Sequence, residues 1–357
     1  MAKVLSFPEF YSPANAGEYN FSPSTRALFA QVQGFRREHS VKVAATDTVK
    51  VHLLLIDLQS DFCFPDGTLY VGGRSGTGAV DDNRRIAEFI YRNLGVLTRI
   101  TPTMDTHFPI QIFLPSFWVD EDNNPLLPHD VITGDLTIIR QGKSAGTATP
   151  SRAVAGSICD GNYTWLCRQA RFYCQELEKG GKYQLYIWPE HCMLGSDGHV
   201  LAGVIQEARM FHSYIRAVQS EVEVKGGNPL TENYSVFAPE VLMRFDGVPM
   251  ASKNVRFLKR LLEADTVIIA GQAASHCVKS SVDHLLSEIA TQDPALAKKV
   301  YMLSDCTSAV AVPNPAGGFF VDFTPQAEEA LARYADAGMN VVKSTDPIET
   351  WPGIRIA

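Results

Sequence analysis

Short apolar runs alternate with segments of helical spacing over most of the chain after residue 50. The run 51–56 ends at the carboxylate of Asp57 and is typical of a parallel strand that is buried on both faces. In 82–94 apolar residues recur every three to four positions, which predicts an amphipathic helix. The same reasoning predicts strands at 98–104, 183–188, 221–225, 266–270, 299–303 and 340–342, and helices at 201–218, 252–263, 278–290 and 325–335. This alternation predicts an α/β fold with helices on both faces of a mostly parallel sheet.

Two segments do not follow this alternation. Residues 1–50 are rich in Pro, Ser, Asn and aromatic residues, and we interpret them as an N-terminal extension that lies on the domain. Residues 110–182 combine loop-like sequence and a Gly- and Ser-rich stretch with one predicted helix, 163–178. We interpret this stretch as a long insertion. The predicted organisation is therefore an extension followed by one domain, 51–357, that carries the insertion.

Composition favours a globular cytoplasmic protein. Hydrophobic residues make up 45% of the 357 residues and charged residues 20%, which is enough apolar material for a large core. A net charge of -7 without a basic stripe argues against nucleic acid as a partner. We expect neither a membrane span nor a signal peptide, because no apolar run is long enough. Seven cysteines without a CxxC pair argue against a thiolate zinc cage and fit a reducing compartment.

Polar side chains collect just after the predicted strands. In an open parallel sheet, ligands bind beyond the carboxyl ends of the strands, so these side chains are expected along one rim. A carboxylate, a second carboxylate with two histidines, a lysine and a cysteine meet there. The residues are Asp57, Asp105, His107, Glu190, His191, Lys225 and the segment 272–277.

Each of these residues also has a purely structural interpretation. Asp57 could cap a turn, Lys225 could be a solvated charge, and Cys277 could be an inert buried thiol. Cys277, however, follows a strand and a glycine-led loop and opens a predicted helix. The positive end of a helix favours a reactive thiolate, so Cys277 is the candidate nucleophile.

The histidines predict a metal site on the same rim. Asp105 and His107 offer a carboxylate and an imidazole to one ion, and His191 could supply a third ligand and leave other positions open. A lone histidine is more often a satisfied core residue. Cys192, next to His191, is better explained as part of the core than as a ligand.

Six motifs in this order resemble nicotinamidases, which belong to the isochorismatase-like cysteine hydrolases. They are IDLQSDFC (56–63), TMDTH (103–107), WPEHC (188–192), VKG (224–226), NYSVF (233–237) and GQAASHCVK (271–279). WPEHC together with a strand, a glycine and Cys-Val is quite specific, and YSVF favours nicotinamidases over their cousins. The resemblance covers most of the chain outside the extension and the insertion. It implies the three-layer α/β/α fold of the isochorismatase-like proteins.

The resemblance also implies roles for single residues. Asp57, Lys225 and Cys277 correspond to the catalytic triad, and the backbone N–H groups of Ala273 and Cys277 to the oxyanion hole. It implies a cis peptide bond between Gln272 and Ala273. The implied metal ligands are Asp105, His107 and His191, and the implied substrate-binding residues are Phe62, Trp188, Tyr234 and Gln59. The implied cofactor is one divalent metal ion, zinc, with iron or manganese as alternatives.

The chain departs from the family pattern near the first histidine. Thr106 stands where Trp is usual, and Phe108 separates His107 from Pro109. Some relatives supply an additional metal ligand a few residues further on, and Ser116 is only a weak candidate here. These differences bear on the substrate more than on the chemistry.

The implied activity is hydrolysis of nicotinamide to nicotinic acid and ammonia through a cysteine thioester, a reaction of NAD salvage and pyridine nucleotide biosynthesis. The implied partner is a small carboxamide, and a homo-oligomer is left open. One alternative is hydrolysis of another carboxamide or of an N-carbamoyl or ureido substrate, but such relatives generally lack the metal set. True isochorismatases lack the nucleophilic cysteine. A second alternative is a non-catalytic binding protein on the same fold, and the complete triad argues against it.

Overall fold

The computed structural model describes residues 4–179 and 183–356. The chain divides into two compact units. The first unit comprises Met1–Asp105, Asp197–Val224 and Val255–Ala357, and the second comprises Thr106–Ser196 and Lys225–Asn254. The boundaries of these units lie close to those of the predicted insertion, but the second unit also takes in a later segment. The assignment of one domain with an extension and an insertion stays a prediction.

A six-stranded sheet has the strand order β14-β11-β10-β1-β2-β9. Its strands are β1 (Val51–Ile56), β2 (Arg99–Asp105), β9 (Glu223–Lys225), β10 (Thr266–Gly271), β11 (Val300–Leu303) and β14 (Asn340–Val342). β1 is parallel to β10 and to β2, and β11 is parallel to β10 and to β14. All residues of β1 and β10 are buried, as expected for central strands covered on both faces. The predicted mostly parallel sheet is confirmed.

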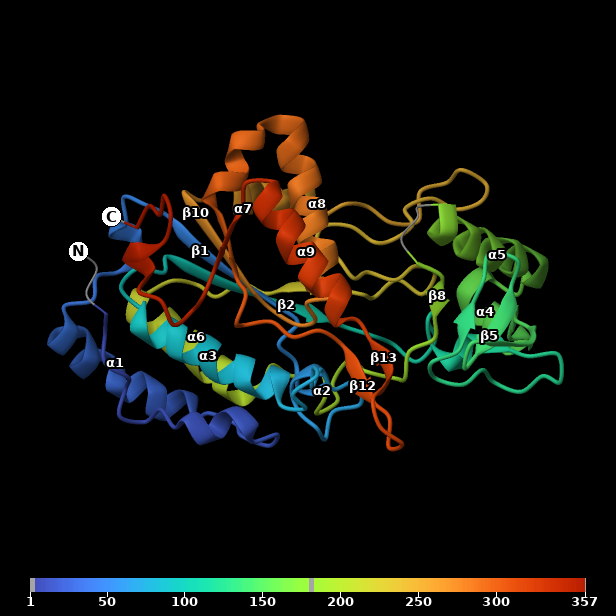
Figure 1. The fold of residues 1–357 in the computed structure, drawn as a ribbon, viewed down its shortest axis with the longest axis horizontal. Coiled ribbons are helices and arrows are strands. Elements are labelled where there is room, and N and C mark those ends of the chain that lie inside the picture. Colours follow the sequence, from blue (N-terminus) through green and yellow to red (C-terminus); the bar gives the residue numbers. More distant parts are fainter. Residues whose placement is uncertain (1–3, 180–182, 357) are drawn as a thin grey trace. The chain divides into compact units, whose positions relative to one another are not determined.

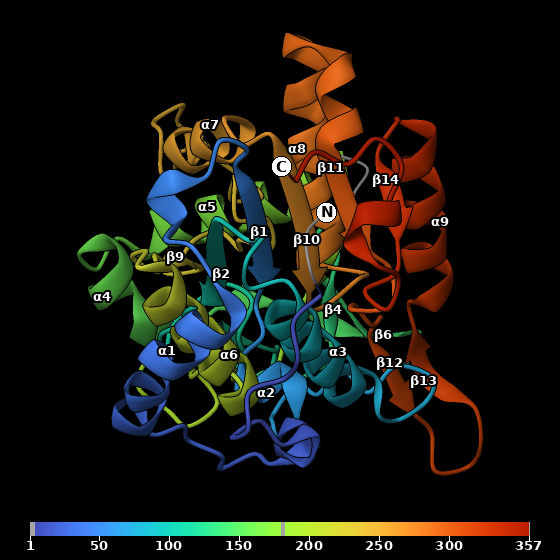
Figure 2. The same cartoon turned by 90° about the vertical axis from the view of Figure 1, so that its left-hand side faces the viewer.

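Helices cover both faces of this sheet (Figures 1 and 2). One layer contains α1 (Thr25–His39), α3 (Gly78–Arg92) and α6 (Gly203–Arg216), and α6 packs against the other two. The opposite layer contains α7 (Val255–Leu262), α8 (Cys277–Gln292) and α9 (Thr324–Asp336). The predicted three-layer α/β/α architecture is therefore confirmed. Smaller elements of this unit are α2 (Ser60–Cys63) and the antiparallel hairpin of β12 (Ala311–Pro313) and β13 (Phe319–Asp322).

The N-terminal segment contains a helix that our sequence analysis did not predict. α1 buries Leu28, Val32 and Phe35, which are spaced as one face of a helix and pack with the core of the first unit. The extension is therefore tied to the domain by an ordinary amphipathic helix.

The described residues of the second unit form short antiparallel strands and helices. β3 (Trp118–Val119) pairs with β7 (Thr149–Pro150), and a four-stranded sheet has the order β6-β5-β4-β8. The strands of that sheet are β4 (Val131–Ile132), β5 (Thr137–Arg140), β6 (Lys143–Thr147) and β8 (Leu185–Tyr186), and the helices are α4 (Ala155–Cys159) and α5 (Tyr163–Lys179). α5 agrees with the helix predicted at 163–178.

The strand predicted at 183–188 was wrong as a member of the parallel series. β8 is only two residues long and pairs antiparallel with β4, with Val131 opposite Tyr186 and Ile132 opposite Leu185. An apolar run specifies that a segment is buried but not which strand it pairs with. Here the partner is supplied by the insertion itself.

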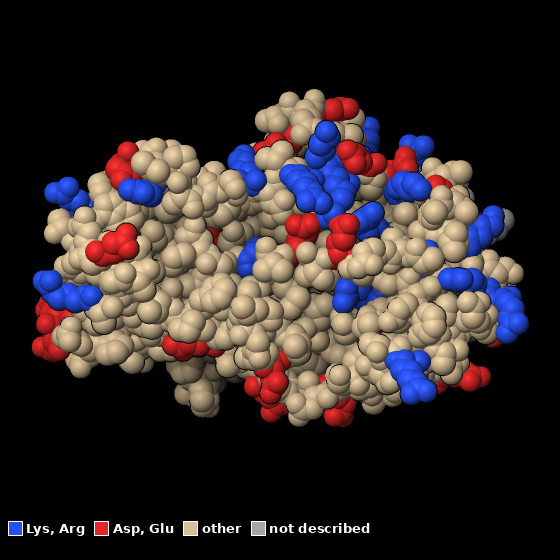
Figure 3. Space-filling model, turned by 180° about the vertical axis from the view of Figure 1, so that it is seen from behind, with Lys and Arg blue, Asp and Glu red and all other residues tan. Residues whose placement is uncertain are grey.

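Charges of both signs are interspersed on the face shown in Figure 3. Ion pairs also form in the first unit, where Arg260 contacts both Glu221 and Glu223 and Arg99 lies 3.3 Å from Glu221. That nucleic acid is not a partner stays a prediction. Within residues 4–179 and 183–356, no helix combines the length and the apolar character needed to cross a membrane.

Candidate active site and metal centre

Three neighbouring strands of the first unit bring a thiol and two carboxylates together. Asp57 directly follows β1, Asp105 ends β2, and Cys277 begins α8 after the loop that follows β10. One carboxylate oxygen of Asp57, one of Asp105 and the Sγ atom of Cys277 all lie within 4.8 Å of one another. All three residues are buried. The structure thus brings together the predicted nucleophile and its predicted base.

Asp57 is held in place by Thr103 of β2. Asp57 has a φ of +46°, which turns the chain sharply at the end of β1. Its backbone N–H donates to Thr103 Oγ1 at 3.0 Å, and the Thr103 hydroxyl donates to Asp57 Oδ1 at 2.5 Å. These two bonds orient both the backbone and the carboxylate. Thr103 lies in the TMDTH motif, but the motif by itself does not indicate this role.

Gln59 forms a two-way pair with the backbone of Asp105. The Asp105 N–H donates to Gln59 Oε1 at 2.7 Å, and Gln59 Nε2 donates to the carbonyls of Asp105 at 2.7 Å and His199 at 2.9 Å. The Gln59 side chain is completely buried. This arrangement fixes the end of β2, which is a positioning role, whereas the predicted contact of Gln59 with substrate stays a prediction.

Gly271 lets the nucleophile loop, residues 272–277, pass close to β1. Its φ is +127°, and an added Cβ would lie 2.1 Å from the carbonyl oxygen and 2.5 Å from the nitrogen of Ile56. Any L side chain would therefore collide with backbone. The N–H of Gln272 donates to the same Ile56 carbonyl at 2.8 Å. The loop is thereby fixed to the end of β1, one residue before Asp57.

The nucleophile loop then turns into α8. The Gln272–Ala273 peptide bond is cis, as the resemblance implied. The Ala273 carbonyl accepts the N–H groups of His276 at 3.0 Å and Val278 at 3.2 Å. α8 begins at Cys277, so the thiol has the helix-start position that the sequence predicted, where the helix dipole favours negative charge.

His107 and His191 are neighbours in the second unit. Their ring centroids are 4.6 Å apart, with the ring planes at 70°. The two chain segments are joined through the backbone, because the His107 N–H donates to Cys192 and the Leu194 N–H donates to His107, both at 3.0 Å. Both rings are buried.

Backbone carbonyls select which nitrogen of each ring can bind a metal. His107 Nδ1 lies 3.3 Å from the Gly226 carbonyl oxygen, and His191 Nδ1 lies 2.7 Å from that of Pro189. A carbonyl oxygen can only accept, so in each neutral ring Nδ1 carries the proton and Nε2 keeps its lone pair. Metal-binding histidines are commonly oriented in this way.

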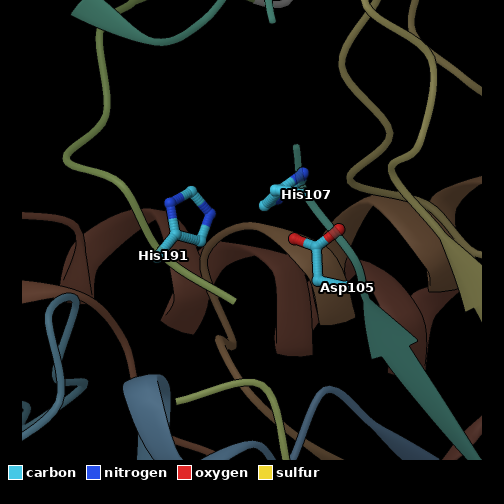
Figure 4. A group of neighbouring side chains, drawn as sticks. All are labelled: Asp105, His107 and His191. Atoms are coloured by element: carbon cyan, nitrogen blue, oxygen red, sulfur yellow. The ribbon is translucent and has the colours of Figure 1, made fainter. Parts of the chain in front are cut away.

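The Asp105 carboxylate joins the two imidazoles, as Figure 4 shows. One ligand atom from each of Asp105, His107 and His191 lies within 4.8 Å of the other two. One carboxylate and two imidazoles suit zinc, iron or manganese and leave coordination positions open. Together with the Nδ1 bonds to carbonyls, this donor set fits the divalent ion that the resemblance implied. Asp105 belongs both to this cluster and to the cluster that it forms with Asp57 and Cys277.

Ser116 does not join this group. Its hydroxyl donates to the Pro109 carbonyl at 2.5 Å, and the side chain is exposed. The ring of Phe113 instead packs edge-on against His107, with centroids 4.8 Å apart. Ser116 is therefore not placed as a further ligand.

The other predicted site residues are also buried. Lys225 ends β9, and its carbonyl accepts the N–H of Thr106 at 2.9 Å. Trp188 Nε1 donates to the Tyr234 hydroxyl at 2.8 Å, which fixes the indole. Phe62 lies in α2. The catalytic role of Lys225 and the contacts of the three aromatic residues with substrate stay predictions.

Comparisons with known proteins find nicotinamidases. No protein-family model matches the chain. The nicotinamidase of Escherichia coli K12 is 27% identical over 142 residues, which are 39% of this chain, and the match spans about half, 54%, of that relative's length. The yeast nicotinamidase bound to the inhibitor nicotinaldehyde aligns with a TM-score of 0.47 and 17% identity, covering 82% of this chain and 99% of that one. A nicotinamidase/pyrazinamidase of Acinetobacter baumannii aligns with a TM-score of 0.47 and 16% identity over 84% and 99%.

The motifs of the chain resemble those of the isochorismatase-like hydrolases. The chain is similar in particular to nicotinamidases, and the bacterial sequence match confirms the resemblance that the motifs indicated. Structural alignments with TM-scores below 0.5 identify no individual residue. The roles of single side chains therefore depend on the geometry above.

Proposed function

We propose that the protein is a cysteine amidohydrolase that converts nicotinamide to nicotinic acid and ammonia. The observation that carries this proposal is that Asp105 belongs to two clusters. It lies with Asp57 and Cys277 in one and with His107 and His191 in the other. A thiolate and oxyanion donors suffice for ordinary amide hydrolysis, and an adjacent metal gains a specific use when the substrate itself carries a ligand atom. The nitrogen of a pyridine ring, meta to the carboxamide, is such an atom.

In the proposed reaction, Asp57 accepts the Cys277 proton as Sγ forms a bond with the carboxamide carbon. The resulting oxyanion is bound by the N–H groups of Ala273 and Cys277, each contributing about 3 kcal/mol of transition-state stabilisation. Asp57 then gives the proton to the departing ammonia as the C–N bond breaks, and water hydrolyses the thioester. Lys225 supplies a positive charge that holds the ionised groups in place. Thr103 keeps the Asp57 carboxylate oriented through both proton transfers.

Asp105, His107 and His191 would hold one divalent ion, zinc, with iron or manganese as alternatives. When bound, the ion supplies an electrophilic contact for a ring nitrogen of the substrate. The chain itself contributes orientation, since the carbonyls of Gly226 and Pro189 direct both Nε2 atoms.

Aromatic residues complete the proposed substrate pocket. Phe62 and Trp188 are proposed to contact the faces of the flat ring, which adds about 1 kcal/mol beyond simple burial. The hydrogen bond from Trp188 to Tyr234 supports this proposal, because it leaves the indole little rotational freedom. Gln59 holds the backbone of Asp105 in place through two hydrogen bonds.

The test is ammonia release by purified protein, reconstituted with zinc, iron or manganese, over a panel of carboxamides. Nicotinamide and pyrazinamide should be hydrolysed, and benzamide, which lacks the ring nitrogen, should have a kcat/KM roughly 100-fold lower. Equal turnover of benzamide would contradict the metal-anchoring argument. A preference for N-carbamoyl substrates would favour the metal-independent alternative, and no turnover of any amide would favour a binding protein.

A further inference from the structure

A closed ring of hydrogen bonds lies behind the nucleophile loop and has no part in the reaction proposed above. It joins Asp82 on α3, Gln272 in the loop and Ser308 in the segment after β11. Gln272 Nε2 donates to Asp82 Oδ2 at 2.8 Å, and the Ser308 hydroxyl donates to the same oxygen at 2.6 Å. The Ser308 N–H donates to Gln272 Oε1 at 3.2 Å, so both ends of the amide are used.

Burial of a carboxylate such as that of Asp82 costs free energy, but both of its oxygens accept hydrogen bonds. Asp82 is 1% exposed and Gln272 is 0% exposed. Burial raises the pKa of Asp82, and the hydrogen bonds from Ser308, Gln272 and Arg85 oppose that rise. Arg85 donates to the remaining oxygen, Oδ1, at 2.8 Å. A buried polar network of this kind fixes one geometry more firmly than apolar packing does.

The geometry that this network fixes is that of the proposed oxyanion-binding peptide. The side chain of Gln272 and the Gln272–Ala273 peptide share one Cα atom. On one side of that peptide the Gln272 N–H is bonded to Ile56 at 2.8 Å, and on the other the Ala274 N–H is bonded to the Ser308 carbonyl at 2.8 Å. The hydrogen bonds of the Gln272 side chain to Asp82 and Ser308 add a third restraint. The direction of the Ala273 N–H therefore depends on where Gln272 is held.

We propose that Asp82 is a positioning residue that holds Gln272 so that the Ala273 N–H points at the oxyanion formed on Cys277. The inference rests on the proposed function, because it gives Cys277 and the Ala273 N–H the roles that they have in the proposed reaction. A backbone donor contributes fully only when it is in place before the charge develops. Displacing it by about 1 Å can cost roughly 100-fold in rate.

The main test compares two chemistries of the same thiol in Gln272→Met. Methionine is similar in length but forms neither hydrogen bond. Nicotinaldehyde would form an adduct in which Sγ of Cys277 bonds to the aldehyde carbon and the aldehyde oxygen becomes the oxyanion, with no leaving group. Iodoacetamide alkylates the same thiolate without an oxyanion. We expect kcat for nicotinamide and affinity for nicotinaldehyde to fall together by roughly 10- to 100-fold, with KM and the alkylation rate changed by less than about 3-fold.

Asp82→Asn tests the carboxylate with almost no change in size. One amide oxygen must then serve the donors that two carboxylate oxygens serve now, and the amide nitrogen faces at least one of them. We expect the same pattern of effects as in Gln272→Met, about 10-fold or more on kcat and on nicotinaldehyde affinity. Alkylation of Cys277 should again be unchanged.

Tyr91→Phe is the matched control. Tyr91 also lies on α3 and loses a buried hydrogen bond, 2.9 Å long, to Glu207, but it does not contact the nucleophile loop. It should change none of the three measurements. Unchanged aldehyde affinity in Gln272→Met, or alkylation that slows in step with kcat, would overturn the inference. A wild-type protein that hydrolyses no carboxamide but still binds the aldehyde through Gln272 would sink the proposed function and leave this inference standing.

Discussion

The thiol and the histidines are held by two different kinds of structure. Asp57 and Cys277 follow β1 and β10, which pair in continuous parallel register over six residues. His107 and His191 lie in segments without regular structure, joined by an isolated bridge, and one backbone carbonyl orients each ring. A continuous strand ladder places the first pair, whereas an isolated bridge and two hydrogen bonds from ring nitrogens to carbonyls contribute to placing the second. Substitutions at the strand ends should therefore change chemistry and leave the position intact, whereas substitutions near the histidines should change position as well.

The largest effect should come from Cys277→Ala. Removing the nucleophile should reduce kcat for nicotinamide by roughly 10⁴-fold or more, because the remaining residues cannot form the thioester. The strands that hold it should be unaffected, so the melting temperature should stay within a few degrees of wild type. Ammonia release and thermal unfolding followed by circular dichroism measure the two. Cys167→Ala, in the second unit, should retain full activity. Turnover by Cys277→Ala within 10-fold of wild type would place the nucleophile elsewhere.

His191→Ala should come next and should separate the two groups. Losing one of three ligands should weaken metal affinity by at least about 100-fold and raise KM for nicotinamide. Alkylation of Cys277 should proceed at the wild-type rate, because His191 is not a member of the cluster formed by Asp57, Asp105 and Cys277. Metal content after dialysis, measured by mass spectrometry, is the direct readout. His129→Ala, also in the second unit, is the control, and full retention of metal by His191→Ala would exclude His191 as a ligand.

A smaller effect is expected from Thr103→Val on β2. The variant keeps the shape of the side chain but loses both hydrogen bonds to Asp57. Hydrogen bonds to charged groups contribute about 1.5–3 kcal/mol, so kcat should fall roughly 10- to 100-fold. Thr101→Val is the matched control, since Thr101 lies on the same strand and bonds to His52 instead, at 2.8 Å. Equal losses in the two variants would show that the strand, and not the carboxylate, was disturbed.

The last prediction concerns the acid stability of the first unit, and no change of activity is expected from it. Burial lowers the pKa of His52 to about 3 and that of His212 to about 4, from an ordinary value of 6.5. Between pH 6.5 and these values the unfolded chain binds protons that the folded chain does not. The free energy of unfolding should therefore fall as pH falls through this window, by about 1.4 kcal/mol per pH unit for each histidine.

Urea unfolding between pH 7 and 4.5 measures this loss, and His212→Gln isolates one contribution to it. The variant should lose less stability than wild type over the same range, because glutamine does not titrate. Parallel curves for the two proteins would show that His212 is not held neutral in the folded state.

The strand ends were predictable from sequence because they depend on local patterns. The apolar run 51–56 coincides with β1, and Cys277 begins a helix as its position after a strand and Gly271 suggested. Buried parallel strands must be apolar throughout, and a strand–loop–helix turn has a recognisable composition. The pattern therefore encodes both the strand and the place of the residue that follows it.

The partners of the site residues were not predictable in the same way. The carbonyls that orient the two histidines belong to Gly226 and Pro189, and every residue has a carbonyl, so no side chain marks them. Asp82 and Gln272 are 190 positions apart in the sequence, and a carboxylate on a helix ordinarily indicates a solvent-facing position. Only the folded chain shows that they meet. The bond between the Thr103 hydroxyl and Asp57 was hidden in the same way, because the sequence indicates only that Thr103 lies in a strand.

Gly271 lies at the end of β10, where its backbone passes close to Ile56 of β1. Its missing side chain is usually described as a matter of size, but the collision with Ile56 arises from the direction in which an L residue projects its Cβ. A D-alanine introduced by chemical ligation would project its methyl group to the opposite side of the backbone from an L residue, and a positive φ has the sign that D residues favour. The requirement at this position is therefore one of handedness, and glycine meets it as the only achiral residue among the twenty.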